Sequence, residues 1–283
     1  MLAFSPDKIL RQGAKSFFVN FPRIGYGMGV LLQKLGAEKT RRKILPEPKD
    51  YPRPTTIDCR RNGFQWQLDL SQWLDWHLFF GFQSQEDRQL LSLVRSGDCV
   101  IDGGGYIGIL ALRLAARVGS TGQIHCFEAD PLNFARLEQH VRLNSLQNVH
   151  CLPMALAERS GHLEMVRPWP ENGGGNLIDN GAWVSSIARI RVPSLSLDDW
   201  CQRESVQRVN LLKLDLEGYE VRALRGARQL LSRFRPVLFL EAHEPNLQNH
   251  GDDLAGLERE LASLNYRWEK IPGDIASMVA FPR

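Results

Sequence analysis

The order of apolar and polar positions predicts a long alternation of strands and helices after residue 97. Apolar runs predict strands at 98–102, 123–128 and 148–153, and amphipathic stretches between them predict helices at 106–118 and 131–145. Further strands are expected at 161–166, 187–192, after Val209 and after Arg235, and then a helix at 251–264 and a terminal hairpin of 266–271 with 277–281. This alternation predicts an α/β fold whose mostly parallel sheet ends in an antiparallel pair and carries helices on both faces.

Residues 1–63, which precede this alternation, have a different sequence pattern. Residues 1–45 have a helical but irregular pattern, and the prolines from Pro46 to Pro54 form a stiff linker. Residues 63–70 then alternate apolar with polar, which predicts a half-buried strand. We therefore expect a helical arm with its linker over residues 1–63 and one large domain over residues 64–283.

Charge separates these two parts as well. Residues 1–63 hold 13 Lys and Arg against 5 Asp and Glu, a local charge of +8, whereas the whole chain carries +3. The apolar stretch from Phe17 to Leu35 is interrupted by Asn20, Pro22 and Arg23, so it does not predict a membrane span. Two uses of the arm stay open, which are docking on its own domain and peripheral contact with an anionic membrane. No nucleic-acid partner is expected, and a homodimer stays open.

The cysteines indicate a reducing compartment. The chain has 5 of them and no C-x-x-C pair, and Cys99 and Cys126 fall inside predicted core strands. An odd set of this kind is typical of apolar filling in a cytoplasmic protein rather than of disulfides or metal ligands.

A glycine loop follows the first strand of the alternation. Asp102 ends the strand, and the loop runs through Gly103, Gly104, Gly105, Tyr106 and Ile107 to Gly108. Glu128 ends the next strand at the spacing where doubly wound sheets place an acid on ribose hydroxyls. The pattern favours a nucleotide site, although Gly103, Gly105 and Gly108 also satisfy the dinucleotide fingerprint, and tight turns use glycines too.

Ionisable residues gather after two later strands. Asp215 and Glu217 follow one strand, and Glu241 and His243 follow the next. Because the carboxyl ends of parallel strands meet at one sheet edge, these groups should face one crevice. A divalent cation site is an alternative use of the same four residues, as are helix capping and a buried structural acid.

The chain resembles the FkbM-type S-adenosylmethionine-dependent methyltransferases of the class I fold over roughly residues 81–244. The motifs that carry the resemblance are Asp102 to Gly108, Phe127 to Pro131, Leu143-Asn144, Ser196 to Asp198, Lys213 to Glu220, Leu224 to Ala227, and Arg235-Pro236 before Leu240-Glu241. The first loop of that family usually reads D-V-G-A-N-I-G, so this chain departs from it at Gly103, Gly105 and Tyr106.

The resemblance implies a Rossmann-like, seven-stranded methyltransferase domain that binds S-adenosyl-L-methionine. Asp102 and the loop Gly103, Gly104, Gly105, Tyr106 and Gly108 would face the methionine part, and Asp215 would also bind the cofactor. Glu128 would hold the ribose, beside Ala129, and Ala155 would border the adenine. His243 would act as the base toward an acceptor hydroxyl, with Asp215, Glu217 and Glu241 as rivals or helpers, and no metal is expected.

The acceptor implied by the resemblance is a small molecule, namely a sugar, glycolipid or secondary metabolite. The Gly/Asn-rich stretch from Pro168 to Gly181, with Trp169 and Trp183 near its ends, predicts a substrate loop or else a disordered surface loop. Two other functions remain as alternatives. One is an NAD-dependent oxidoreductase, and the other is a non-catalytic protein that binds a membrane or polyanion through its basic arm.

Overall fold

The computed structural model describes residues 6–82, 85–168, 173–181, 189–272 and 276–283. The chain forms two compact units, residues 1–83 and residues 84–283. The expected boundary at 63/64 falls instead in the turn of a hairpin within the first unit. Thr56–Arg61 (β1) pairs antiparallel with Phe64–Asp69 (β2) around that turn, so the two sides of the expected boundary are held together by one ladder.

The N-terminal unit contains the helices predicted for residues 1–45. They are α1 (Pro6–Asn20), α2 (Pro22–Lys34) and α3 (Glu38–Ile44), followed by the 3₁₀ turn η1 (Pro48–Asp50), the β1–β2 hairpin and α4 (Trp73–Phe80). Buried Arg41 on α3 donates to the Phe80 carbonyl oxygen, and the Trp76 indole donates to the Pro46 carbonyl oxygen at 2.7 Å. These bonds join α3 and the linker to α4.

A seven-stranded sheet forms the centre of the C-terminal unit, in the order β12-β13-β11-β10-β3-β4-β5. Its strands are β3 (Cys99–Gly103), β4 (Gln123–Phe127), β5 (Val149–Leu152), β10 (Leu211–Asp215), β11 (Val237–Glu241), β12 (Tyr266–Lys270) and β13 (Ser277–Pro282). The first five are parallel to one another, and β13 pairs antiparallel with β11 and β12. The predicted mostly parallel sheet with a terminal hairpin is confirmed.

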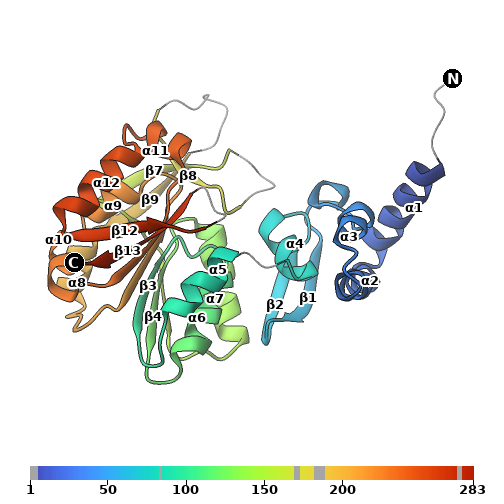
Figure 1. Ribbon diagram of the computed structural model, residues 1–283, viewed down its shortest axis with the longest axis horizontal. Helices are drawn as coiled ribbons and strands as arrows, with labels where there is room; N and C mark the ends of the chain where they lie inside the picture. The colour runs from blue at the N-terminus through green and yellow to red at the C-terminus, as the bar shows by residue number, and fades with distance from the viewer. Residues whose placement is uncertain (1–5, 83–84, 169–172, 182–188, 273–275) are drawn as a thin grey trace. The chain divides into compact units, whose positions relative to one another are not determined.

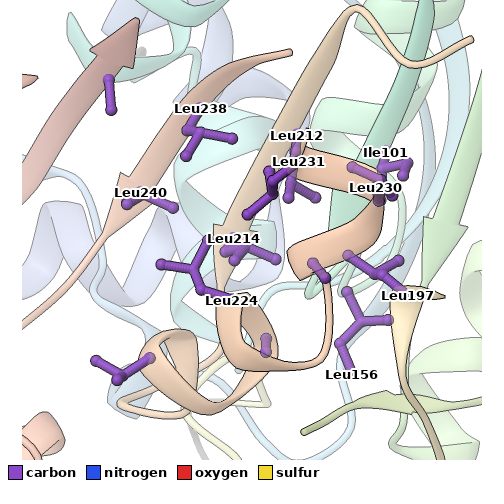
Figure 2. Close-up of a cluster of buried hydrophobic side chains, with 14 of the residues drawn as sticks. Ile101, Leu156, Leu197, Leu212, Leu214, Leu224, Leu230, Leu231, Leu238 and Leu240 are labelled. Carbon is purple, nitrogen blue, oxygen red and sulfur yellow. The ribbon is translucent and has the colours of Figure 1, made fainter. Parts of the chain in front are cut away.

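Helices cover both faces of this sheet (Figure 1). One face carries α5 (Gln85–Leu93), α6 (Ile109–Val118) and α7 (Pro131–Leu143), and the other carries α8 (Leu197–Arg203), α9 (Glu220–Arg225), α10 (Arg228–Phe234) and α12 (Leu254–Ser263); α11 (Glu244–Asn249) follows β11. Leu212, Leu214, Leu238 and Leu240 point from β10 and β11 toward leucines of α9 and α10, as Figure 2 shows. This packing fixes the two strands whose ends carry the acids.

A second, four-stranded sheet was not expected. It has the order β6-β9-β7-β8 and consists of β6 (Ala155–Leu156), β7 (Gly161–Val166), β8 (Leu177–Ile178) and β9 (Arg189–Leu195). The helical pattern after β10 is also divided, because α9 ends at Arg225 and α10 begins at Arg228. A Cβ at Gly226 would lie 2.1 Å from the Ala157 carbonyl oxygen, so only glycine permits this close approach to the chain after β6.

Candidate functional site

The acids predicted at the carboxyl edge do come together there. Lys213 of β10 lies opposite Asp102 of β3, and Asp215 lies opposite Glu241 of β11. Parallel pairing of β3, β10 and β11 therefore brings residues from three distant parts of the sequence to one edge of the sheet.

Buried Lys213 connects the groups of this edge. Its Nζ lies 3.2 Å from Asp102 Oδ1 and 3.4 Å from Asp215 Oδ2. It also donates to the carbonyl oxygens of Gly103 and Gly104, at 3.1 and 2.8 Å. Burial lowers the pKa of the Lys213 ammonium, but the nearby carboxylates outweigh burial and raise that pKa above its usual value. Lys213 is therefore a fixed positive charge beneath the loop.

Asp102 has no exposed surface. Its carboxylate contacts Lys213 on one side and Cys126 on the other, with Sγ 3.6 Å from Oδ2. Because Asp102 is completely buried, its carboxylate binds Lys213 inside the protein. The resemblance instead implied that Asp102 would face the methionine part of the cofactor.

The glycine loop folds tightly against its neighbouring strands. A Cβ at Gly104 would lie 1.9 Å from the Asp215 carbonyl oxygen, and one at Gly105 would lie 2.1 Å from Cys126 Sγ. The N–H groups of Gly104 and Gly105 both donate to the Phe127 carbonyl oxygen, and that of Gly108 donates to the Gly105 carbonyl oxygen. These glycines thus permit close contacts inside the protein. That the same loop faces the cofactor stays a prediction.

Tyr106 lies in this loop with a φ of 49°. A left-handed conformation is uncommon for a residue other than Gly, Asn or Asp, and it marks Tyr106 as a strained position. Its backbone N–H donates to Glu128 Oε2 at 2.8 Å. The strained residue therefore connects the glycine loop to the acid at the end of β4.

Both carboxylate oxygens of Glu128 accept backbone N–H groups. Oε2 accepts from Tyr106, and Oε1 accepts from the N–H of Asp130 at 2.8 Å. Burial raises the pKa of Glu128 to about 7, although these two bonds lower it. The carboxyl group is held in one orientation and changes charge near neutral pH.

Asp215, Glu241 and His243 form the more exposed part of the edge. Asp215 is about one third exposed, and His243 Nε2 lies 3.4 Å from Glu241 Oε1. His243 immediately precedes α11 as its N-cap residue. The arrangement places an imidazole beside a carboxylate at the end of β11, as the order of residues predicts.

Glu217 occupies the turn after β10 with a φ of 53°. It accepts a hydrogen bond from Asn246 Nδ2 at 2.8 Å, and burial together with the charge of Asp215 raises its pKa to about 8. Buried Glu220 stabilises the same turn, since its Oε1 accepts hydrogen bonds from the N–H groups of Leu216 and Gly218. Glu217 thus borders the edge, whereas Glu220 shapes the turn.

Ala155 lies in a small buried apolar cluster, and Ala129, which directly follows Glu128 after β4, lies beside that cluster. Buried Ala155 belongs to β6 and packs in a cluster with Met165, Ile178 and Tyr219, and partly buried Ala129 packs against that cluster. Through Ala129, this buried cluster adjoins the end of β4, where Glu128 lies.

A network around Asp130 was missed by the sequence analysis. Asp130 Oδ1 accepts from the N–H groups of Leu132 and Asn133 at the start of α7. Oδ2 forms an ion pair with Arg167 and accepts from Asn176 Nδ2 at 3.1 Å. The expected helix over residues 131–145 begins beside Asp130, but no local pattern pointed to Arg167 or Asn176.

The same network anchors the predicted substrate loop. Asn133 Nδ2 donates to the Gly173 carbonyl oxygen at 2.8 Å, so Gly173, Asn176 and Arg167 are all bound at the start of α7. Trp169 and Trp183 lie outside the described residues.

Two features are absent from the part of the chain that the structure describes. No group of three or more His, Cys, Asp or Glu side chains in that part could hold a metal ion. None of its helices is long and apolar enough to cross a membrane.

Comparison with known proteins gives a family match over the same region. The model of the methyltransferase FkbM domain matches residues 102–268. The 2-O-methyltransferase NoeI of Sinorhizobium fredii is 27% identical over 169 aligned positions, and the match covers 52% of this chain and 65% of NoeI. The chain thus spans slightly less than two thirds of that curated relative.

Solved structures of similar proteins have low identity. Methyltransferase FkbM from Methylobacillus flagellatus is 19% identical with a TM-score of 0.47, and the match covers 67% of this chain and 45% of that one. Fibrillarin from Aeropyrum pernix, in complex with natively bound S-adenosyl-L-methionine, is 15% identical with a TM-score of 0.44 over 80% of this chain and 82% of that one.

Proposed function

Because the chain belongs to the FkbM methyltransferase family, we propose that it transfers a methyl group from S-adenosyl-L-methionine to a hydroxyl group of a sugar, glycolipid or secondary metabolite. The observation that carries the proposal is the convergence of Glu128, Asp215, Glu241 and His243 on the carboxyl edge of one parallel sheet. The printed name of NoeI, a 2-O-methyltransferase, supports a hydroxyl as the acceptor.

The residues at this edge fit the polar parts of the cofactor. Each Glu128 oxygen accepts one N–H group, and a carboxylate oxygen has a second lone pair that can accept from a ribose hydroxyl. The apolar cluster containing Ala155, with Ala129 beside it, fits the adenine. Partly exposed Asp215 supplies negative charge for the ammonium and sulfonium.

Asp102 would act indirectly in this arrangement. It is completely buried and holds Lys213, which in turn fixes Asp215 and the carbonyl oxygens of Gly103 and Gly104. We therefore assign Asp102 and Lys213 to positioning the loop and assign direct contact to Asp215.

When bound, S-adenosyl-L-methionine supplies an electrophilic methyl group on its sulfonium. A hydroxyl acceptor must lose its proton as it attacks, and His243 is placed to accept it. In the tautomer that donates Nε2–H to Glu241, Nδ1 keeps the lone pair that a base needs. Asp215 and Glu217 are the rival bases, and positioning of the two substrates accounts for the remaining rate.

Two variants test these assignments separately. Glu128→Ala is expected to weaken binding of S-adenosylhomocysteine, measured by calorimetry, because it removes the acceptor of both ribose hydroxyls. His243→Ala should leave that affinity unchanged and lower turnover about a hundredfold or more. His162→Ala, at an exposed histidine of β7, is the matched control and should change neither quantity.

The acceptor itself requires a screen. Methyl-labelled S-adenosyl-L-methionine is incubated with pools of sugars, glycolipids and hydroxylated metabolites, and labelled products are identified by mass spectrometry. Label on a hydroxyl oxygen supports the proposal. Label found solely on nitrogen or carbon acceptors, with hydroxylated pools unlabelled, would contradict O-methylation while leaving the cofactor assignment intact.

A further inference from the structure

Helix α2 packs into the N-terminal unit through its glycines. The two buried residues of this helix are Gly25 and Gly29. A Cβ at Gly25 would lie 3.1 Å from Phe18 Cβ, and one at Gly29 would lie 3.4 Å from Leu45 Cδ1. The side of α2 that carries Gly25 and Gly29 therefore faces α1 and α3. In an ordinary surface helix, the buried side instead carries the large apolar residues.

Six large apolar side chains of this region face outward instead. Between 38% and 69% of each is exposed, and they follow one another at spacings of four and three residues: Phe17, Phe21, Ile24, Met28, Leu31 and Leu35. Spacings of this kind keep side chains on one side of a helix. Phe17 and Phe21 continue the row across the junction of α1 and α2, with their ring centroids 4.9 Å apart. We call these six residues the apolar row.

The charged residues within the segment that carries the apolar row have one sign. Residues 10–36 contain Arg11, Lys15, Arg23 and Lys34 and no Asp or Glu. Lys15 is paired with Glu47 and Asp50, whereas Arg11, Arg23 and Lys34 are exposed. A second copy placed on this row would bring like charges together, whereas an anionic surface supplies the opposite charge.

We propose that the apolar row of α1 and α2 docks on an anionic lipid surface, with the apolar side chains entering the boundary between headgroups and acyl chains and the basic residues contacting the headgroups. A helix that presents large apolar residues beside Lys and Arg binds such surfaces through burial of the apolar side chains and through electrostatic attraction to the headgroups. The inference does not depend on the proposed methyl transfer, because it concerns the N-terminal unit alone.

The test is co-sedimentation of the full chain with vesicles. Wild-type protein is expected to partition onto vesicles of mixed phosphatidylglycerol and phosphatidylcholine, and to bind phosphatidylcholine alone more weakly. Raising the salt concentration should weaken binding to the anionic vesicles, because screening reduces the attraction of Arg11, Arg23 and Lys34 to the headgroups.

Variants of exposed residues separate the row from the rest of the surface. Ile24→Gln combined with Leu31→Gln removes two half-exposed apolar groups and should lower the partition coefficient about thirtyfold. Leu143→Gln, at an exposed leucine of α7 in the other unit, is the matched control and should leave it unchanged. Circular dichroism checks that helix content is kept in all variants.

Three outcomes would overturn the proposal. Wild-type protein that stays in the supernatant excludes a lipid surface. Equal partitioning of the double variant, the control and the wild type excludes the apolar row. A wild-type dimer that the double variant converts to a monomer, without vesicle binding by either, assigns the row to a second copy of the chain. Light scattering of the same samples measures that last outcome.

Discussion

Cofactor affinity is predicted to depend on the charge of Glu128. Burial raises the pKa of Glu128 to about 7, so the carboxyl group is mostly protonated below that pH and mostly ionised above it. Ribose hydroxyls donate hydrogen bonds, and an ionised carboxylate accepts them more strongly than a protonated one. Affinity for S-adenosylhomocysteine should therefore increase as pH rises through 7.

The magnitude follows from the ionised fraction. A group with a pKa of about 7 is roughly one-tenth ionised at about pH 6 and roughly nine-tenths ionised at about pH 8. The dissociation constant should therefore be about tenfold larger at the lower pH, a difference of about 1.4 kcal/mol in binding free energy. Binding in turn should lower the pKa of Glu128 and release protons near neutral pH.

Calorimetry at several pH values, in buffers of different ionisation enthalpy, measures both the affinity and the protons released. Glu128→Gln should flatten the pH profile. Glu220→Gln is the matched control, because burial also raises the pKa of Glu220 to about 7, yet its carboxylate binds the turn after β10. A flat profile for the wild type, or a profile that survives in Glu128→Gln, would refute the assignment of Glu128 to the ribose.

Three further predictions concern stability and the loop network. Burial raises the pKa of Glu220 in the folded protein to about 7, so the stability that this group contributes is present at acid pH and is lost as pH rises through about 7. The free energy of unfolding of Glu220→Gln, measured with urea, should therefore increase by up to about 3 kcal/mol relative to that of the wild type between about pH 5 and pH 8. Equal pH dependence in both proteins would contradict this. Gly104→Ala should cost about 3 kcal/mol or more because its Cβ meets the Asp215 carbonyl oxygen. Gly81→Ala, also at positive φ but with open space around the added Cβ, should cost about 1 kcal/mol; similar losses in both would remove the steric argument. Arg167→Gln breaks the ion pair with Asp130 and should speed amide hydrogen exchange over residues 173–178. Arg189→Gln, which breaks the ion pair with Asp179, should leave the N–H groups at the start of α7 protected. Unchanged exchange in Arg167→Gln would mean that the Arg167–Asp130 pair does not hold residues 173–178.

The strands of the main sheet were predictable because their signals are local. Each buried strand is a short apolar run, and the helices between them show their own periodicity. The meeting of Asp215 with Glu241 followed from topology alone, since parallel neighbours deliver their carboxyl ends to one edge. The fold class and the group of acids were therefore accessible without coordinates.

The contacts inside the site were not accessible in this way. Lys213 pairs with Asp102 across more than a hundred residues, and a lysine within an apolar run gives no sign of its partner. The loop glycines show the same limit, because sequence indicates that Gly104 and Gly105 lack a Cβ but not that the Asp215 carbonyl and Cys126 occupy that space. Such close approaches depend on tertiary packing, which no local pattern encodes.

The central claim is that the carboxyl edge of the sheet binds S-adenosyl-L-methionine, and calorimetric titration of the full chain tests it most directly. S-adenosylhomocysteine and NADH are titrated separately at about pH 8, where Glu128 is ionised. The account predicts saturable one-to-one binding of S-adenosylhomocysteine, weakened in Glu128→Ala, and no binding of NADH. Binding of NADH without binding of S-adenosylhomocysteine would contradict it and would favour a dinucleotide-dependent oxidoreductase.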